Sequence, residues 1–415
     1  MGRLMPAAAE VPCDTGRLIH AVGPAPVAHE CHAAGHWSRG TDKLQGSAQL
    51  KPIDASIKSG LLALATLLLP ATLHAAQGAW TYPSPSVTRP QQAALLNVTQ
   101  AGRRLVAVGE RGLVLLSDDD GQHWRQSPTP VSVTLTRAHF VSERTGWAIG
   151  HSGVILRTSD GGSTWIKQFD GIQGARLAAA RYSESSADPL ARALAPSAAQ
   201  LVSDGADKPF FDILFSDDRN GLVIGAYGLI FRTDDGGDHW TPWLEHLDNP
   251  QGLHLYGIAR SGKSLFIAGE RGLLLQSVDG GRQFKSMSTP YKGSYFGIVS
   301  LDGGDLYLYG LRGNLFRSID HGKSWTRLAS PSDASFSAGM ALSDGEAAFA
   351  NQAGQLLVGR RSADTLAAVS DIAPGPYTSI TRSHSGTWIL ASLRGLSRAA
   401  PGKPAGASTP SLTVK

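Results

Sequence analysis

The chain has 415 residues, of which 42% are hydrophobic and 17% are charged, and its formal net charge is +4. This length can bury a large core, and so small a net charge does not indicate a nucleic-acid-binding protein. No helix-turn-helix, zinc-finger or RNA-binding signature is present, so we expect no nucleic-acid partner.

The first predicted element is a secretory signal at residues 51–76. An apolar run at 61–73, LLALATLLLPATL, follows Lys51 and Lys58 and precedes Ala75 and Ala76. The run is short for a transmembrane helix and has the length of a signal-peptide core. We therefore expect cleavage near Ala75 or Ala76 and a periplasmic protein, with an uncleaved membrane anchor as the alternative. Residues 1–50 lack periodicity, and we interpret them as a non-native or disordered leader.

Both cysteines, Cys13 and Cys31, lie in that leader. The mature chain would then have no disulfide and no thiol chemistry. Because no cysteine lies at the cleavage site, we do not expect a lipoprotein anchor.

A short motif, S/T-x-D-x-G-x-x-W, occurs five times, about every forty residues except for one longer gap. The Asp can accept backbone N–H bonds, the Gly allows a positive φ, and the aromatic residue can anchor the turn on a sheet. We interpret the copies as structural Asp turns, because a calcium loop would need a longer spacing and a closing Glu. The defining residues are Asp119, Gly121 and Trp124; Asp160, Gly162 and Trp165; Asp235, Gly237 and Trp240; Asp279, Gly281 and Phe284; and Asp320, Gly322 and Trp325.

Each Asp turn belongs to a longer unit, in which a β-rich run, a G-x-x-G turn and a second apolar run precede the Asp turn and the fourth strand follows it. Two further units without the Asp turn, at Ala347 to Gly359 and Trp388 to Arg398, bring the number to seven. Each unit is typical of a four-stranded antiparallel meander, so we predict an all-β, seven-bladed β-propeller over residues 77–400. Ring closure usually combines both chain ends in one blade. We therefore predict that residues 79–84 supply the last strand of the seventh blade.

A long insertion separates the second and third units. Residues 172–208 are rich in Ala, and we predict one or two short helices broken at Pro189 and Pro196. Residues 401–415 are rich in Pro, Gly and Ser, and we expect a disordered tail.

The residue before the second Gly of the G-x-x-G turn is Arg in four of the seven units. Alternate turns of a meander lie on opposite faces, so these turns and the insertion should share one face, with the Asp turns on the other. Guanidinium groups bind carboxylates, so an arginine cluster would recognise an acidic partner. Solvated or locally paired arginines are the alternative, because Glu110 and Glu270 stand beside two of them. The seven residues are Arg111, Ser152, Tyr227, Arg271, Arg312, Ala353 and Arg394.

A second set of arginines ends the third strand of three units. We interpret Arg157, Arg232 and Arg317 as contacts between neighbouring blades, because they precede the Asp turns and would lie on strands.

The longer unit, G-x-x-G-x-[IL]-x-R-[ST]-x-D-G-G-x-x-W, resembles the photosystem II stability/assembly-factor family, most clearly in Gly150 to Trp165 and Gly225 to Trp240. The resemblance covers about residues 79–400 and implies a propeller of bacterial neuraminidase (Asp-box) repeats. It also implies an arginine-rich face that binds photosystem II assembly intermediates, although Ser152, Tyr227 and Ala353 are not basic. The insertion is more typical of relatives in non-photosynthetic bacteria, which are often linked with resistance-nodulation-division type exporters. The positions that match the family's basic face are Arg111, Arg271, Arg312 and Arg394.

Three functional hypotheses follow. The first is a monomeric, non-enzymatic periplasmic scaffold that binds a membrane-protein complex through these arginines and Tyr227. The second is an accessory protein of a resistance-nodulation-division type exporter. The third is a sialidase-like glycoside hydrolase, which needs a Tyr nucleophile and a Glu partner, for which Tyr227 and Glu110 are the candidates. For the favoured scaffold we expect no catalytic residue, metal or cofactor.

Overall fold

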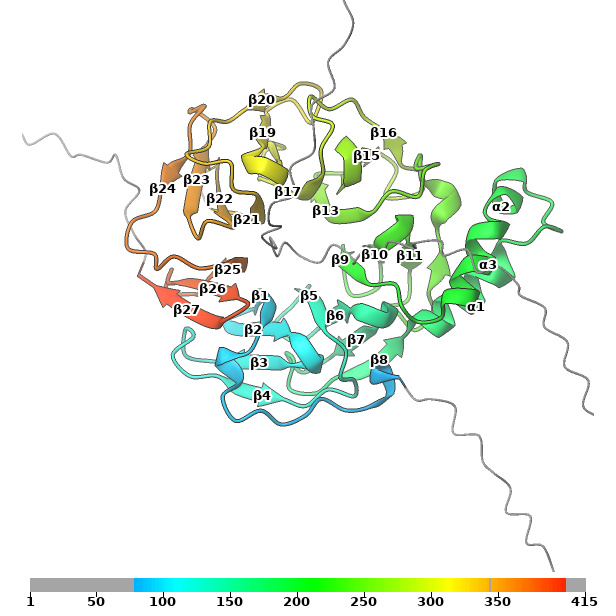
Figure 1. The fold of residues 1–415 in the computed structure, drawn as a ribbon, viewed down its shortest axis with the longest axis horizontal. Coiled ribbons are helices and arrows are strands. Elements are labelled where there is room, and N and C mark those ends of the chain that lie inside the picture. The colour runs from blue at the N-terminus through cyan, green and yellow to red at the C-terminus, as the bar shows by residue number, and fades with distance from the viewer. Residues whose placement is uncertain (1–77, 343–344, 401–415) are drawn as a thin grey trace, which may run out of the picture. The chain divides into compact units, whose positions relative to one another are not determined.

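The computed structural model describes residues 78–342 and 345–400. They form seven antiparallel sheets arranged around one axis (Figure 1), so the predicted all-β, seven-bladed propeller is confirmed. The predicted leader, signal peptide and tail lie outside the described residues and stay predictions. None of the helices in the described ranges is both long enough and apolar enough to cross a membrane.

The first four sheets each have four strands in meander order. Blade 1 contains β1 (Leu95–Ala101), β2 (Arg104–Gly109), β3 (Val114–Ser117) and β4 (Arg125–Ser127). Blade 2 contains β5 (Leu135–Phe140), β6 (Gly146–Gly150), β7 (Ile155–Thr158) and β8 (Ile166–Phe169). Blade 3 contains β9 (Phe210–Phe215), β10 (Gly221–Gly225), β11 (Ile230–Thr233) and β12 (Thr241–Pro242). Blade 4 contains β13 (Leu255–Ser261), β14 (Ser264–Gly269), β15 (Leu274–Ser277) and β16 (Lys285–Ser286).

The remaining blades follow the same order, with the first strand of each blade innermost (Figure 1). Blade 5 contains β17 (Tyr295–Ser300), β18 (Leu306–Gly310), β19 (Leu315–Ser318) and β20 (Thr326–Arg327). Blade 6 contains β21 (Phe336–Ala341), β22 (Glu346–Asn351), β23 (Leu356–Arg360) and β24 (Ala367–Ala368). Blade 7 has three described strands, β25 (Tyr377–Arg382), β26 (Trp388–Ser392) and β27 (Gly395–Ala399).

The apolar core lies between neighbouring sheets. Strands β6, β10 and β18 are buried over their whole length, because both faces of each sheet pack against other blades. Trp147 of blade 2, for example, stacks on Phe215 of blade 3 with ring centroids 3.4 Å apart. Each blade therefore depends on its two neighbours for burial of its apolar side chains.

A buried carboxylate on β9 links three blades. Asp212 Oδ1 pairs with Arg137 Nε of blade 2 at 2.9 Å, and the Asp212 side chain is only 8% exposed. Its Oδ2 accepts a hydrogen bond from the Ile258 amide of blade 4 at 3.0 Å. Polar side-chain contacts near the axis thus join inner strands that belong to different sheets.

The prediction that residues 79–84 complete blade 7 is wrong. Residues Ala79–Thr81 form a single 3-10 turn, η1, beside the connection from blade 1 to blade 2, where Ser132 N donates to Ala79 O at 2.8 Å. Trp80 packs against the apolar cluster between these two blades. Trp80-Thr81 resembles the Trp240-Thr241 and Trp325-Thr326 pairs that follow two Asp turns, which favours a strand in the sequence, but Trp80 serves as an anchor here. Pro83 and Pro85 have no N–H to donate to a sheet ladder, which disfavours a strand.

Hydrogen bonds between the inner strands of blades 7 and 1 close the ring instead. Thr378 Oγ1 donates to Leu95 O at 2.6 Å. Ser379 Oγ accepts from Asn97 Nδ2 and from Val98 N, both at 3.1 Å. Side chains of β25 and β1 therefore contribute to closure, together with an apolar cluster in which Ile389 and Ala391 of blade 7 pack against blade 1.

The predicted helical insertion is present and forms three helices, α1 (Gly171–Arg181), α2 (Pro189–Ala193) and α3 (Ala195–Asp204), at the outer side of the ring (Figure 1). Pro189 and Pro196 lie in the first turns of α2 and α3, so they start helices and do not break them. Proline fits there because its missing N–H would have no partner within the helix. Arg181 and Tyr182 bond to Glu245 after β12, which fixes the insertion to blade 3.

Candidate functional site

The two kinds of turn lie on opposite faces of the ring. In blade 1, the G-x-x-G turn after β2 bonds to the start of β1, where Glu110 N donates to Ala94 O at 3.0 Å. In blade 2, the Asp turn lies beside the turn between β5 and β6, where Gly161 N donates to Arg144 O at 2.9 Å. Helix α1 begins against the G-x-x-G turn of blade 2. The insertion therefore shares a face with the G-x-x-G turns.

The Asp turns use their polar groups internally. In blade 2, Asp160 Oδ1 accepts from Thr158 Oγ1 at 2.8 Å and from Thr164 N at 2.9 Å. The Trp165 indole donates to Gly162 O at 2.9 Å. The same bond from the Ser or Thr hydroxyl to the Asp carboxylate occurs in all five turns. These carboxylates are therefore committed to folding the turn.

Four of the Asp turns also accept a hydrogen bond from the preceding blade, so they contribute to the interfaces at which blades 1 to 4 meet the blade before them. The bonds run from Arg398 to Asp120 O, from Arg104 to Gly161 O, from Trp147 to Gly236 O and from Trp243 to Gly281 O, at 3.0, 3.1, 3.2 and 2.8 Å.

The predicted blade contacts of the strand-end arginines are confirmed at two positions. Arg317 pairs with Asp364 of blade 6 at 2.8 Å, and Arg157 lies 3.6 Å from Asp238 of blade 3. Arg232 lies over the ring of Trp243 in its own blade, with the guanidinium carbon 5.0 Å from the ring centroid.

Five of the G-x-x-G turns hold their third residue in the left-handed conformation, with φ of 53° at Arg111, 55° at Tyr227 and 54° at Arg271. Residues other than glycine rarely adopt it. The second glycine packs under the connection to the next blade, since a Cβ on Gly112 would lie 2.0 Å from Val131 O. The turn thus holds one side chain at a fixed outer position. The five turns are η3 (Glu110–Gly112), η4 (His151–Gly153), η5 (Ala226–Gly228), η7 (Glu270–Gly272) and η8 (Leu311–Gly313).

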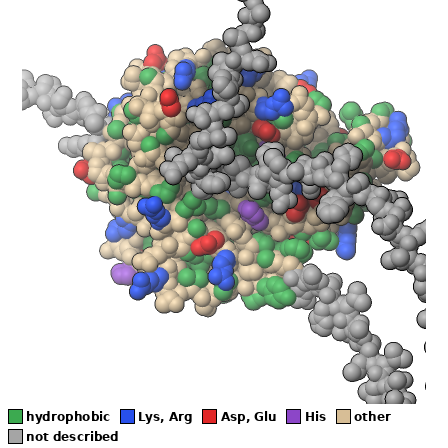
Figure 2. All heavy atoms as spheres, viewed as in Figure 1, with side chains coloured by type: hydrophobic (Ala, Val, Ile, Leu, Met, Phe, Trp, Pro, Cys, Tyr) green, Lys and Arg blue, Asp and Glu red, His purple; other side chains and the backbone are tan. Residues whose placement is uncertain are grey.

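Arg111, Arg271 and Arg312 are exposed at this left-handed residue, and Arg394 is exposed at the equivalent place between β26 and β27, where its φ is not positive. None of the four forms an ion pair with another described residue. They fall into two pairs of adjacent blades, blades 4 and 5 and blades 7 and 1. Figure 2 shows that Lys and Arg side chains on the visible face are dispersed around the ring, with Asp and Glu between them. We call the four residues the arginine face, and they are Arg111, Arg271, Arg312 and Arg394.

The two acidic neighbours do not pair with these arginines. Glu110 Oε1 accepts from Ala94 N at 3.1 Å, and Glu270 Oε2 accepts from His254 N at 3.2 Å. Both carboxylates thereby fix the segment that enters the inner strand of their own blade. The structure thus differs from the locally paired alternative considered for Arg111 and Arg271.

The other three predicted positions interrupt the arginine face. Tyr227 is 49% exposed, and its ring lies 5.0 Å from Lys208 Nζ and 4.7 Å from the His254 ring. Ser152 is partly exposed and Ala353 is exposed. Blades 2, 3 and 6 therefore carry no cation at this position.

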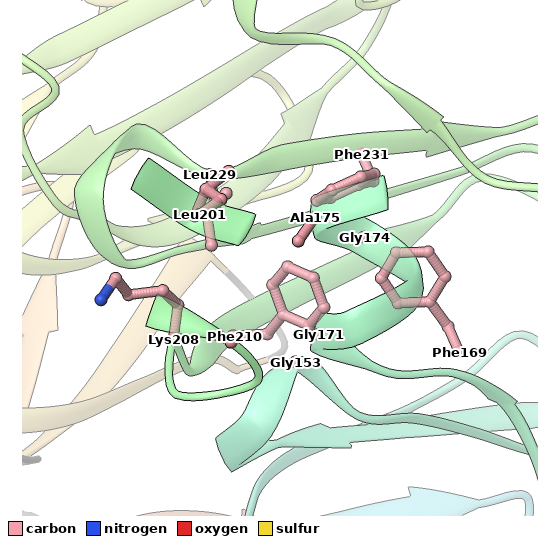
Figure 3. Close-up of a pocket in the computed structure, with 11 residues that line it drawn as sticks. Gly153, Phe169, Gly171, Gly174, Ala175, Leu201, Lys208, Phe210, Leu229 and Phe231 are labelled. Carbon is pink, nitrogen blue, oxygen red and sulfur yellow. The ribbon is translucent and has the colours of Figure 1, made fainter. Parts of the chain in front are cut away.

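A small pocket lies between the insertion and blades 2 and 3 (Figure 3). Phe169, Phe210 and Phe231 line it, and the Lys208 side chain extends away from these rings. Its interior holds about 20 Å³, which is room for about one water molecule. We interpret the pocket as a small gap in the packing between the insertion and the two blades, because a ligand would not fit in it. Within residues 78–342 and 345–400, no group of three or more His, Cys, Asp or Glu side chains could hold a metal ion.

The turn motifs do not reveal three aromatic residues that lie on the same face as Tyr227. Phe211, Tyr256 and Phe296 each occupy the second position of an inner strand, in blades 3, 4 and 5. Their equivalence is visible in the sequence when the repeats are aligned on their first strands and not on their turns.

Comparison with known proteins identifies relatives of this chain. A sequence profile of the family described as "Photosynthesis system II assembly factor YCF48" matches residues 193–400. Among curated proteins, 73 residues are 37% identical to the "Photosystem II assembly lipoprotein Ycf48" of Synechococcus sp. (strain CC9902). That match covers 18% of this chain and 22% of the relative, so it spans about a fifth of the relative's length.

Several solved structures share the fold. "YCF48 bound to D1 peptide" has a TM-score of 0.55 at 17% identity and covers 76% of this chain and 97% of that one. "YCF48 from Cyanidioschyzon merolae" has a TM-score of 0.54 at 15% identity, covering 78% and 99%. A virginiamycin B lyase from Staphylococcus aureus has a TM-score of 0.57 at 13% identity, covering 74% and 94%. At these identities the likeness concerns the fold alone, which is compatible with both binding proteins and enzymes.

Proposed function

The chain belongs to the family of the photosystem II assembly factor YCF48, and we propose that it is a non-enzymatic periplasmic scaffold that binds a membrane-protein partner through the arginine face. One observation carries this proposal: four guanidinium groups stand exposed at one repeated position without an ion-pair partner among the described residues. A cation left unpaired in the free protein can pair with a ligand carboxylate without first breaking an internal bond.

The partner's binding segment should be acidic. One family member is described in complex with a D1 peptide, which supports a peptide segment as the ligand. Charge-assisted, bidentate bonds from arginine favour carboxylates in such a segment. An exporter subunit is the alternative partner, and the capture experiment below would distinguish it by its identity.

The positions of the sialidase-type candidates favour binding over catalysis. Tyr227 lies on η5 in blade 3, and Glu110 lies on η3 in blade 1. The Glu110 carboxylate is bonded to the Ala94 amide and does not face a tyrosine. A nucleophile and its base must lie within hydrogen-bond reach of each other, so these residues do not form that pair.

The periplasmic location is supported by the sequence. The apolar run at 61–73 has the length and flanking residues of a secretory signal. From that side of a membrane, a monomeric propeller could reach the extracytoplasmic segments of its partner.

Capture from detergent-solubilised membranes of the source organism tests the proposal. The full chain should retain a membrane protein that a variant with Arg111, Arg271, Arg312 and Arg394 all changed to Gln does not retain. Retention should also fall as salt rises, because exposed ion pairs are screened.

A matched variant controls for the loss of charge. Arg103, Arg144, Arg219 and Lys263 are exposed cations between the first and second strands of blades 1 to 4, on the opposite face. Changing these four to Gln should leave capture intact. Equal capture by all three proteins would overturn the role of the arginine face.

A further inference from the structure

All seven inner strands carry a β-bulge at the same place. In blade 4, Leu255 pairs with Gly269 and Gly257 pairs with Ala268, so Tyr256 has no partner in the ladder. The same shift occurs after the first residue of every other inner strand. These positions lie on the face of the G-x-x-G turns, because Gly269 is the first glycine of such a turn. The bulge ring consists of Leu96, Thr136, Phe211, Tyr256, Phe296, Ser337 and Thr378.

Bulges redirect a side chain and are frequent near functional sites. Every member of the bulge ring is partly exposed, whereas the residue before it is buried. The ring therefore presents one side chain from each blade to the surroundings of the axis.

Three members of the bulge ring have a structural task. Thr136 Oγ1 donates to Phe210 O at 2.7 Å, Ser337 Oγ donates to Tyr377 O at 2.6 Å, and Thr378 Oγ1 donates to Leu95 O at 2.6 Å. In each case the acceptor is the residue before the bulge in the next blade. A hydroxyl at this position thus joins adjacent inner strands.

In blades 3, 4 and 5 the bulge residue is aromatic, and this hydrogen bond to the next blade is not formed. The Phe211 and Tyr256 ring centroids are 5.5 Å apart, and those of Tyr256 and Phe296 are 5.7 Å apart. The row of aromatic rings continues outward. The His254 ring centroid lies 5.9 Å from that of Tyr256, and the His254 ring contacts the ring of the half-exposed Tyr227. No described residue bonds to the Tyr256 hydroxyl. Large, partly exposed rings without a bonding role are typical of contact surfaces.

Cations of the same blades lie on the same face. Arg271 is in the G-x-x-G turn of blade 4 and Arg312 in that of blade 5, and Lys292 is exposed in the connection between these blades. The acidic residues on this side are Asp333, near the turn of Arg312, Glu270, whose carboxylate accepts from His254 N, and Asp204 and Asp207, which pair with Lys208. The other pair, Arg394 and Arg111, adjoins Thr378 and Leu96 and has no aromatic neighbour in the bulge ring.

We propose that Phe211, Tyr256 and Phe296 form a docking surface for an extended acidic segment of a protein partner. An apolar side chain of the segment packs on the rings, and its carboxylates pair with Arg271 and Arg312. The inference rests on the proposed function, for which it locates the contact in blades 3 to 5 and adds an apolar requirement. Arg271, Arg312 and Lys292 form no ion pair with a described residue, and these unpaired cations are the reason for choosing an acidic partner.

Short fluorescent peptides test this surface on the full chain. One pool contains two Asp and one Phe at varied spacing, and matched pools replace Phe with Ala or Asp with Asn. Anisotropy should show binding of the first pool at least about tenfold tighter than of either matched pool, as expected when an anchor residue is lost. Failure of the first pool to bind, or equal binding of all pools, would overturn the proposal.

Other blades of this protein show which residue can replace the aromatic side chains at the bulge position. Tyr256→Thr with Phe296→Thr introduces the residue that blades 2 and 7 use at this position, so the fold should be kept. We expect at least about tenfold weaker peptide binding and an unchanged or higher melting temperature. Thr136→Val with Thr378→Val should lower the melting temperature and leave peptide binding unchanged.

Two further results show whether the aromatic surface or the proposed function is wrong. If Arg271→Gln with Arg312→Gln weakens binding and the threonine variant does not, the aromatic surface is wrong while the proposed function stands. If the threonine variant abolishes self-association in sedimentation and leaves peptide binding unchanged, a second copy of this chain occupies the surface and the proposal is wrong.

Discussion

At the scale of single residues, most carboxylates near the turns are already used by the fold. The aspartates of the Asp turns accept from their own turn, and Glu110 and Glu270 accept from backbone amides. The arginines of the G-x-x-G turns have no such partner among residues 78–342 and 345–400. The carboxylates therefore serve the fold, whereas the arginines are available to bind a partner.

Asp320 gives a pH-dependent test of the Asp turn. Its pKa is lowered from 3.8 to about 2, because the hydroxyl and amide of Ser324 and the hydroxyl of Ser318 donate to the carboxylate. The ionised form is favoured in the folded state. Its contribution to stability is therefore complete above pH 3.8 and is lost as the pH falls through about 2.

We expect Asp320→Asn to flatten the decrease in unfolding free energy over this pH range, measured by urea unfolding. Asp302→Asn, at an exposed aspartate between β17 and β18 that forms no hydrogen bond with a described residue, should keep the wild-type slope. Equal slopes for Asp320→Asn and wild type would show that this turn is not the source of the pH dependence.

At the scale of elements, one position of the inner strand performs different tasks in different blades. The bulge residue is a hydroxyl donor in blades 2, 6 and 7 and an aromatic side chain in blades 3 to 5. The next residue, such as Asp212, accepts from the following blade. The repeat thus provides a fixed scaffold on which single substitutions convert a structural contact into an exposed surface.

Asp212 should contribute strongly to the interface between blades. We expect Asp212→Ala to lower the unfolding free energy by about 3 kcal/mol, because it leaves Arg137 and a buried amide of blade 4 without their acceptor. Chemical denaturation measures the change. Asp118→Ala provides the comparison, since Asp118 pairs with Arg104 at 2.6 Å but is 54% exposed, and it should cost at most about 1 kcal/mol. Similar losses for the two variants would contradict the role of burial.

At the scale of the whole molecule, the ring is closed without a fourth strand in blade 7 among the described residues. The contacts between β25 and β1 are hydrogen bonds of side chains to the backbone and to each other. In a closed ring every blade is packed between two others, so a weak joint affects all the interfaces.

Ser379 tests this closure. Ser379→Ala removes the acceptor for Asn97 and Val98, and we expect a loss of about 1 to 3 kcal/mol in unfolding free energy. Hydrogen exchange should rise first in β1 and β25. Ser183→Ala, at an exposed hydroxyl after α1, should change stability by less than about 0.5 kcal/mol. Unchanged exchange in β1 and β25 would show that the ring is held closed elsewhere.

The sequence by itself determined the number of blades, their strand order and the face on which each turn lies. These features follow from local patterns: an Asp turn needs its Ser or Thr, Asp and Gly within a few residues, and a G-x-x-G turn needs its glycines where backbone segments meet. The arginine face was found in the same way, because a repeat places equivalent residues at equivalent positions.

Only the tertiary structure decided how the ends of the chain meet and which side chains remain free. The likeness of Trp80-Thr81 to the pairs after two Asp turns predicts a strand of blade 7 at residues 79–84, yet Trp80 packs against the apolar cluster between blades 1 and 2. The pairing of Glu110 and Glu270 with backbone amides, and the bulges that redirect Phe211, Tyr256 and Phe296, depend on strand register and on contacts between blades. A repeat pattern specifies each blade locally, whereas these contacts form between residues that only the closed ring brings together.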